Sequence, residues 1–427
     1  MGVLGVALIV MLIAFVLLGL PISFSIGVSS IVVLLIGDMP LQLIPTKVYA
    51  GLNSFTFLAI PFFMLAGSLM NAGGLNKRIL RVTTALIGWI SGSLAMVTVV
   101  ASAFFASLTG SGVATASAIG GITIPSMKEE GYPAPFAAAV TAAAAVLGPI
   151  IPPSIPLIVY GSAMSMSISD LFKGSLFPGL ICTVALMILV YFLSKKNNYA
   201  KHARQTKAQI WAALKDGIWA LMMPIIVLGG IFSGLFTPTE AAVVAVFYVT
   251  MIGFLVYKEL TFKSLFEMLF KTGVTAGMMM FAMGNGQISG WIFAVSKLPQ
   301  AAGNFIQSIT SSQLGFLLLA NVFLLITGMF LEANSSVILL TPVLVPIAQM
   351  YGVSTLQFGV MMVFNLCVGM LTPPVAATLL IGNQIAGERL DKTVRAVIPF
   401  LLVEVAVLAL ITIFPQIILW LPNAMRG

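Results

Sequence analysis

The chain has 427 residues, of which 60% are hydrophobic and only 7% are charged. Soluble domains carry about 25% charged residues, and no soluble core hides this much apolar surface, so the composition excludes an ordinary soluble protein. The formal net charge of +8 does not by itself indicate a nucleic-acid partner, because charges on a membrane protein are interpreted by where they fall.

The apolar stretches predict membrane-spanning helices. They recur from 3–20 to 396–421, and none alternates like a strand of a membrane barrel. The first stretch lacks the basic region and the small-residue cleavage site of a removed signal peptide. Cys182 and Cys367 fall inside apolar stretches, so we expect packing residues rather than a disulfide or a ligand pair.

An internal repeat divides the chain in two. At a shift of 221 residues, six Gly or Pro residues of the first half meet identical residues of the second, far more than composition predicts. The pairs are Pro125 and Pro346, Gly131 and Gly352, Gly148 and Gly369, Pro152 and Pro373, Pro153 and Pro374, and Gly161 and Gly382. Earlier in the halves only hydropathy matches.

Each half predicts the same order of elements. Three spans come first, then a less apolar stretch, a segment broken in its middle, a span interrupted by proline, and a last span. In the first half these are 4–20, 22–37, 53–71, 75–91, 94–129, 135–163 and 174–194. In the second half they are 221–236, 239–257, 276–296, 297–313, 315–350, 356–384 and 396–421.

The two broken segments resemble re-entrant hairpins. Each arm has about 15 residues, or roughly 22 Å of helix, which is short of a hydrocarbon core about 30 Å thick. Their middles, 107–112 and 332–336, consist mainly of polar or turn-forming residues. The alternative is one long helix with a polar kink.

Hairpins that enter and leave on one side give each half five crossings, which inverts the second half. The basic residues then fall sixteen on one side and four on the other. The four are Lys47, Lys173, Lys297 and Arg426. The side with sixteen is predicted to be cytoplasmic, which places both termini in the periplasm.

Proline and glycine interrupt the helices in symmetric pairs. Prolines do not donate a backbone hydrogen bond, so carbonyls near them must meet protein, water or a cation. Hydroxyl and amide oxygens at the tips and breaks add to such a site, and symmetry predicts one cation site per half. The polar side chains are Ser107, Thr109, Ser111, Asn334, Ser335 and Thr372. The alternative is that these are simple kinks whose hydroxyls bond back along the helix.

Two acidic residues have local interpretations. Glu332, the one acid predicted at a hairpin tip, either helps to bind a cation or caps the arm that follows it. Glu240 follows Thr237 and Pro238 in a capping-box pattern, which predicts a structural role. The Gly286 and Gly290 spacing is a weak signal for helix docking.

The polar connector at 195–220 has two interpretations. Its six basic residues fit a cytoplasmic topology anchor or a partner-binding surface, and its His202 is expected to be solvated. The chain has no P-loop and no metalloenzyme motif. A transporter is favoured, while an intramembrane hydrolase or a channel remain alternatives.

At these residues the chain resembles the large membrane subunit of TRAP (tripartite ATP-independent periplasmic) transporters. The resemblance runs the whole length and is strongest at 107–115, 148–156, 237–242, 332–336 and 369–374. It implies an all-α elevator-type carrier, not an enzyme, with a scaffold and a moving transport domain. It also implies a small four-helix membrane subunit and a periplasmic binding protein that delivers an organic acid. The general likeness favours sialic acid, with a C4-dicarboxylate as the alternative.

The resemblance further implies sodium as the coupling ion, with no other metal or cofactor. Combined with the breaks and tips, it gives two sets of candidate residues. Sodium is expected at Ser107, Thr109, Gly110, Ser111, Gly148, Pro149, Glu332, Ala333, Asn334, Ser335, Gly369 and Thr372. The substrate is expected at Ser111, Thr115, Pro152, Ser154, Ser336 and Pro373. The scaffold would comprise 1–93 and 221–313, the connector 195–220, and the transport domain 94–194 and 314–427.

Overall fold

The computed structural model describes residues 2–199 and 201–425, and this part of the chain is helical without β-strands. The first half contains α1 (Gly2–Leu17), α2 (Ile22–Ile36), α3 (Leu43–Leu52), the 3₁₀ turn η1 (Phe55–Leu58), α4 (Ala59–Ala72), α5 (Leu75–Ile87), α6 (Ser93–Thr109), α7 (Gly112–Glu129), α8 (Ala134–Val146), α9 (Ile155–Ala163) and α10 (Ile168–Lys196). The second half contains α11 (Lys207–Phe232), α12 (Pro238–Met251), the π turn η2 (Ile252–Val256), α13 (Phe262–Val295), α14 (Leu298–Ile309), α15 (Gln313–Phe330), α16 (Ala333–Met350), α17 (Thr355–Gly369), α18 (Ala377–Ala386), α19 (Leu390–Ile413) and α20 (Gln416–Ala424).

The helix boundaries confirm the repeat. Shifted by 221 residues, α7 coincides with α16 at both ends, and α8 and α17 begin at equivalent positions. Both proline pairs, Pro152-Pro153 and Pro373-Pro374, have cis peptide bonds. The repeat therefore extends from sequence to backbone.

The broken segments form helical hairpins. Gly110 is left-handed with φ of +60°, which ends α6 and turns the chain back so that α7 packs along α6. In the second half α15 and α16 also pack together, and at the open end of the hairpin the Tyr351 hydroxyl donates to the Thr310 carbonyl at 2.8 Å. The alternative of one long kinked helix is wrong for both segments.

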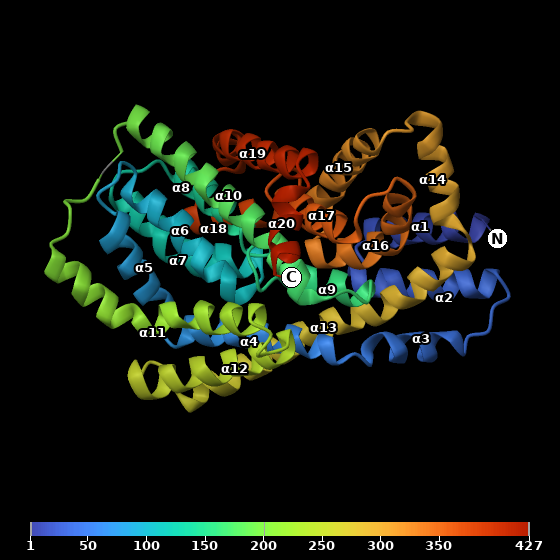
Figure 1. Ribbon diagram of the computed structural model, residues 1–427, viewed down its shortest axis with the longest axis horizontal. Coiled ribbons are helices and arrows are strands. Elements are labelled where there is room, and N and C mark those ends of the chain that lie inside the picture. Colours follow the sequence, from blue (N-terminus) through green and yellow to red (C-terminus); the bar gives the residue numbers. More distant parts are fainter. Residues whose placement is uncertain (1, 200, 426–427) are drawn as a thin grey trace.

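For description we divide the helices into two bodies (Figure 1). The first, here called the scaffold, contains α1–α5 and α11–α14, and the two halves of the chain mix in it, because α2 packs on α13 and α4 packs on α12. The second body, here called the hairpin body, contains α6–α10 and α15–α20. In it α8 packs against α7, α18 and α19, while α17 packs against α15 and α16.

Three joints connect these bodies. They are residues 88–92 between α5 and α6, residues 197–206 between α10 and α11, and residues 310–312 between α14 and α15. In the longest joint, His202 donates its backbone N–H to the Gly88 carbonyl, and its ring pairs with Glu130 at 2.6 Å. The His202 side chain is 38% exposed and so partly solvated as expected, and it also joins the connector to the residue after α7.

Several helices extend beyond their predicted spans. α11 begins at Lys207 and α13 at Phe262, well before the apolar windows at 221 and 276, so only residues 197–206 separate α10 from α11. The predicted last span at 396–421 is divided, because α19 ends at Ile413 and α20 starts at Gln416. Eight helices of the described chain are long and apolar enough to cross a membrane, including both arms of the second hairpin.

Local contacts confirm three smaller predictions. Thr237 and Glu240 form the capping box, with the Thr237 N–H donating to Glu240 Oε2 at 2.8 Å. A methyl group on Gly286 or Gly290 would contact α16, so this spacing does dock a helix. Both cysteines are free and fully buried.

Candidate functional site

The first hairpin tip presses against the break between α8 and α9. A Cβ atom on Gly148 would lie 2.7 Å from the Ser111 carbonyl oxygen and 2.8 Å from Thr115 Oγ1. A Cβ on Gly110 would lie 2.8 Å from the Pro153 carbonyl oxygen. Glycine at both positions therefore lets two irregular backbone segments approach closely.

The hydroxyl groups around this contact donate back to carbonyls. Thr115 Oγ1 donates to the Ser111 carbonyl at 2.8 Å, and Ser107 Oγ donates to the Phe104 carbonyl at 2.6 Å. Thr109 Oγ1 donates to the Phe105 carbonyl at 3.3 Å and lies 3.4 Å from Thr115 Oγ1. A hydroxyl oxygen that donates its proton keeps lone pairs for a cation, so this pattern fits both a kink and a cation site.

Ser154 has a structural role in the first break. Its hydroxyl donates to the Pro149 carbonyl at 2.5 Å and accepts from the Leu157 N–H at 3.3 Å, which caps α9. The side chain is fully buried, and its hydroxyl closes the loop made by the prolines. Pro149 therefore has a satisfied carbonyl rather than an orphan one.

The second hairpin tip is organised by Glu332. Its carboxylate accepts from the Asn334 and Ser335 N–H groups at 3.1 and 3.4 Å and from Asn334 Nδ2 at 2.5 Å. Glu332 therefore caps α16, where the helix dipole stabilises negative charge. The amide oxygen of Asn334 is buried without a hydrogen-bond partner, and this orphan acceptor together with the carboxylate suits a hard cation.

The second break resembles the first. The Met370 carbonyl accepts from the Thr378 N–H at 3.2 Å and from the Thr378 hydroxyl at 3.0 Å. Thr372 Oγ1 donates to the Val368 carbonyl at 2.9 Å. A Cβ on Gly369 would lie 2.5 Å from the Gly328 Cα, so α15 and α17 meet through glycines just before the tip.

The two tips meet in one cavity of about 280 Å³, here called the tip cavity. Ser111 and Val113 line it from the first hairpin, and Glu332, Asn334 and Ser335 line it from the second. The scaffold closes it with α4 and α13. The N-terminal ends of α7 and α16 therefore open into the same space, which holds one carboxylate and no basic side chain.

Two further cavities adjoin the tip cavity. One of about 260 Å³ shares Val159, Met283 and Ile338 with it and is here called the vestibule cavity. The other, of about 410 Å³, shares Ser111 and Thr275 with it and ends at Lys271, so it is called the Lys271 cavity. Together the three cavities form a column between the scaffold and the hairpin body.

The predicted site residues separate into two sets. Those that line the tip cavity or the Lys271 cavity are Thr109, Ser111, Glu332, Asn334 and Ser335. Those that belong to tip or break segments without lining these three cavities are Ser107, Gly110, Thr115, Gly148, Pro149, Pro152, Ser154, Ala333, Ser336, Gly369, Thr372 and Pro373. The structure brings the two tips into one cavity, while binding at any of these residues stays a prediction.

Sequence reasoning missed a polar network that links α15, α17 and α19. Asn365 Nδ2 donates to Asn321 Oδ1 at 2.7 Å, and Asn321 Nδ2 donates to Thr412 Oγ1 at 3.0 Å. Glu404 is also fully buried in α19, and neither of its carboxyl oxygens has a hydrogen-bond partner. The signal was available, because polar or ionisable residues inside apolar spans are rare and frequently functional.

Comparison with known proteins identifies the family. Residues 9–417 match the family described as the DctM component of the tripartite ATP-independent periplasmic transporter. The chain is 38% identical to a sialic acid TRAP transporter large permease protein of Vibrio cholerae, over 96% of each chain. It is 36% identical to a 2,3-diketo-L-gulonate TRAP large permease of Escherichia coli, over 94% of this chain and 95% of that one.

More distant comparisons agree in fold. A C4-dicarboxylate TRAP large permease of Pseudomonas aeruginosa is 34% identical over 93% of this chain and 94% of its own length. The crystal structure of the YdaH transporter of Alcanivorax borkumensis has a TM-score of 0.65 at 13% identity, covering 87% of this chain and 88% of that one. The latter likeness concerns the fold alone.

Proposed function

This chain belongs to the DctM family of TRAP transporters, as a large membrane permease and not an enzyme, and from this premise we propose that it imports an organic acid together with sodium. The observation that carries the proposal is the tip cavity, where both hairpin tips and both half-helix N-termini converge. Ligands of secondary transporters bind at such discontinuities near the middle of the membrane.

The two tips suit ligands of opposite charge. At the second tip the Glu332 carboxylate already occupies the N-terminus of α16, and Asn334 adds a free amide oxygen, so this tip favours a cation. At the first tip the neutral Ser111 caps α7, which leaves the positive end of the helix for an anion. We assign sodium to the second tip and to the contact between Gly148 and Ser111, and the substrate carboxylate to the first tip.

Sodium would then provide charge neutralisation. No basic side chain lines the tip cavity, and burying an unpaired carboxylate is expensive. Bound sodium supplies the missing positive charge, so sodium and acid should each raise the affinity of the other by the same factor. This linkage would couple the import of the acid to the sodium gradient.

Sialic acid is the proposed substrate, and a C4-dicarboxylate is the second candidate. The relative from Vibrio cholerae, named for sialic acid, covers nearly the whole chain, as does the relative from Pseudomonas aeruginosa named for C4-dicarboxylates. Both candidates are supported by sequence identity to these relatives and by the family, and not by a particular residue in the lining of the tip cavity.

The hairpin body would be the moving transport domain of an elevator, in a bacterial inner membrane with both termini in the periplasm. The packing of α8 and α17 inside the hairpin body supports its movement as a unit. The family name denotes a three-component system, so we also propose a small membrane subunit and a periplasmic binding protein as partners.

Proteoliposome uptake tests the function. The purified chain, with its membrane partner and binding protein, should import N-acetylneuraminate in a saturable manner only when sodium is higher outside. Succinate is the competing substrate, and potassium replaces sodium at constant ionic strength. Uptake that persists after the sodium gradient is collapsed would refute the sodium coupling, and a flux linear in substrate concentration would indicate a channel.

A further inference from the structure

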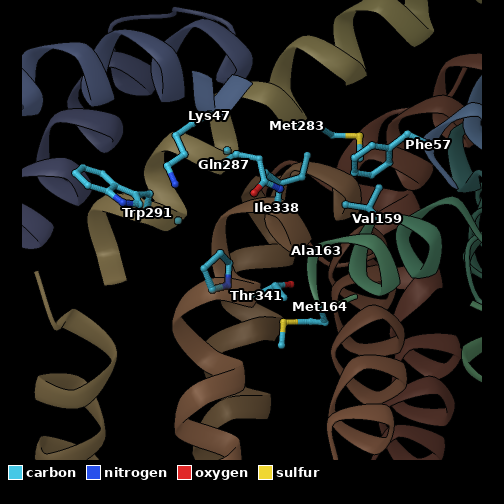
Figure 2. A pocket seen from close by; sticks show the side chains of 13 residues that line it. Lys47, Phe57, Val159, Ala163, Met164, Met283, Gln287, Trp291, Ile338 and Thr341 are labelled. Carbon is cyan, nitrogen blue, oxygen red and sulfur yellow. The ribbon is translucent and has the colours of Figure 1, made fainter. Parts of the chain in front are cut away.

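The vestibule cavity lies between the scaffold and the hairpin body, beside the tip cavity. Helices α3 and α13 form its scaffold wall, and α9 and α16 form its other wall. The polar or aromatic residues that matter here are Lys47, Gln287, Trp291 and Thr341 (Figure 2). Its volume of about 260 Å³ lies just below the range of about 300–1,000 Å³ that is usual for small-molecule sites, so it suits a small ligand.

Lys47 brings an uncompensated positive charge to this cavity. It is the one charged residue in the lining, and its Nζ lies 5.8 Å from the centre of the Trp291 ring. Within residues 2–199 and 201–425 no carboxylate forms an ion pair with it. An ammonium group has three hydrogen-bond donors, and its contact with the aromatic face of Trp291 only weakly replaces hydrogen bonds to acceptors.

Thr341 supplies a second unmet group. This residue on α16 has no exposed surface, and its hydroxyl oxygen has no hydrogen-bond partner. Figure 2 shows Lys47 and Gln287 on the scaffold side of the space and Thr341 across it. Gly51 leaves room for the Gln287 side chain, which a methyl group at that position would overlap. An ammonium, an amide and a hydroxyl thus surround one space.

The repeat shows that this charge is specific to one end of the column. At the 221-residue shift Lys47 corresponds to Met268, which is one helical turn from Lys271. Lys271 lines the cavity at the opposite end, but its ammonium pairs with Glu267 at 2.6 Å. One end of the column therefore offers a free cation, while the charge at the other end is neutralised.

We propose that the vestibule cavity is a separate binding site for a small carboxylic acid, which the acid occupies before it reaches the hairpin tips. This inference rests on the proposed import of an organic acid. Lys47 Nζ binds the carboxylate in a charge-assisted hydrogen bond, and Gln287 and Thr341 bind a hydroxyl or amide group of the same ligand. The acid then moves past Val159 and Ile338, which line both cavities.

Fluorescence of Trp291 provides a test that requires no transport. The chain has five tryptophans, so the vestibule signal is the difference between the wild type and Trp291→Phe. Titrating the purified protein with N-acetylneuraminate, and separately with succinate, should give a saturable change that Trp291→Phe removes. Lys47→Gln should weaken this binding at least fivefold, whereas Lys47→Arg should retain most of it because the charge is kept.

Lys297→Gln is the matched control. It removes one positive charge from the same predicted side of the membrane, at an exposed residue outside the vestibule lining, and should leave the titration unchanged. Unchanged binding in Lys47→Gln would overturn the proposal, and so would an equal loss in Lys297→Gln, which would indicate a general surface potential. Preserved unfolding temperatures for all variants show that the comparison concerns folded protein.

The same variants separate this site from the proposed function. In uptake assays Lys47→Gln should raise KM several-fold with little change in kcat, because the acid still binds at the tips once it arrives. A Lys47-dependent Trp291 signal without acid import would support the vestibule site and refute the proposed function. Acid import with an unchanged KM in Lys47→Gln, and no Trp291 signal, would refute the vestibule site alone.

Discussion

Replacing Gly148 with alanine tests the contact between the first hairpin tip and the first break. The added Cβ would lie 2.7 Å from the Ser111 carbonyl oxygen, whereas ordinary contacts are 3.4–4 Å, so backbone must move by several tenths of an ångström. Overpacking of this kind costs about 1–3 kcal/mol, offset by about 0.4–1 kcal/mol from the stiffer unfolded chain. We expect a net loss of about 1–2 kcal/mol.

Gly121→Ala is the control for this change. Gly121 lies on the exposed side of α7, and a Cβ there would meet no atom within 4 Å. Alanine in an open helix position stabilises by roughly 0.5–1 kcal/mol relative to glycine, so the two variants should move in opposite directions. Gly369→Ala, the repeat equivalent of Gly148, should destabilise, because its Cβ would lie 2.5 Å from the Gly328 Cα.

The assay is thermal unfolding of purified protein in detergent, with and without sodium, followed by uptake in proteoliposomes. Gly148→Ala should unfold several degrees below Gly121→Ala and lose most uptake, because Ser111 moves away from the break. Equal unfolding temperatures and equal uptake in the two variants would refute the close packing of tip and break.

Three further predictions use simpler changes. A thiol-reactive label should reach Gln205→Cys only from the cytoplasm and Gln300→Cys only from the periplasm. The native Cys182 and Cys367 are buried and should stay unlabelled. Reaction of both new cysteines from one side would refute the inverted repeat. Thr109→Ala, Asn334→Ala and Thr372→Ala should each weaken sodium activation of uptake. Thr123→Ala, whose hydroxyl makes the same back-bond to Ile119 away from the tip, should not. The Arg78 guanidinium donates a hydrogen bond to the Glu259 carboxylate and lowers its pKa. The ionised carboxylate therefore stabilises the fold above its unfolded pKa of about 4.3. This stabilisation is lost as pH falls through the lower folded pKa. Glu259→Gln lacks this pH-dependent contribution. When the two proteins are compared under conditions that give them equal stability at pH 7, the wild type should therefore begin to unfold at a higher pH on acidification. Identical acid profiles would contradict this role of Glu259.

The hairpins and breaks were predictable because their causes are local. Gly110 supplies a left-handed turn, and Pro152-Pro153 and Pro373-Pro374 lie where helices end, so the repeat could be read without tertiary information. That the two tips share one cavity depends on tertiary packing and was not among these predictions. The capping box at Thr237 was likewise legible from four consecutive residues.

Helix ends and the vestibule cavity were not predictable in the same way. Hydropathy marks where lipid begins, whereas α13 begins about four turns earlier and includes Lys263, Glu267 and Lys271. Its repeat equivalent is divided into α3, η1 and α4, a difference that hydropathy does not report. Lys47 could be assigned to a side of the membrane, but its neighbours Gln287 and Thr341 come from distant segments that only packing brings together.

If the hairpin body moves as proposed, the three joints limit how far it can travel. Three extended residues reach about 10 Å, and ten reach about 35 Å, so residues 310–312 are a short tether and residues 197–206 a long one. α5 is held on the scaffold by α11, whereas α14 packs mainly on α16 of the hairpin body. In the proposed elevator, a displacement beyond the reach of the short tether would therefore carry α14 with it and change the angle between α13 and α14 at the turn around Ser296 and Lys297.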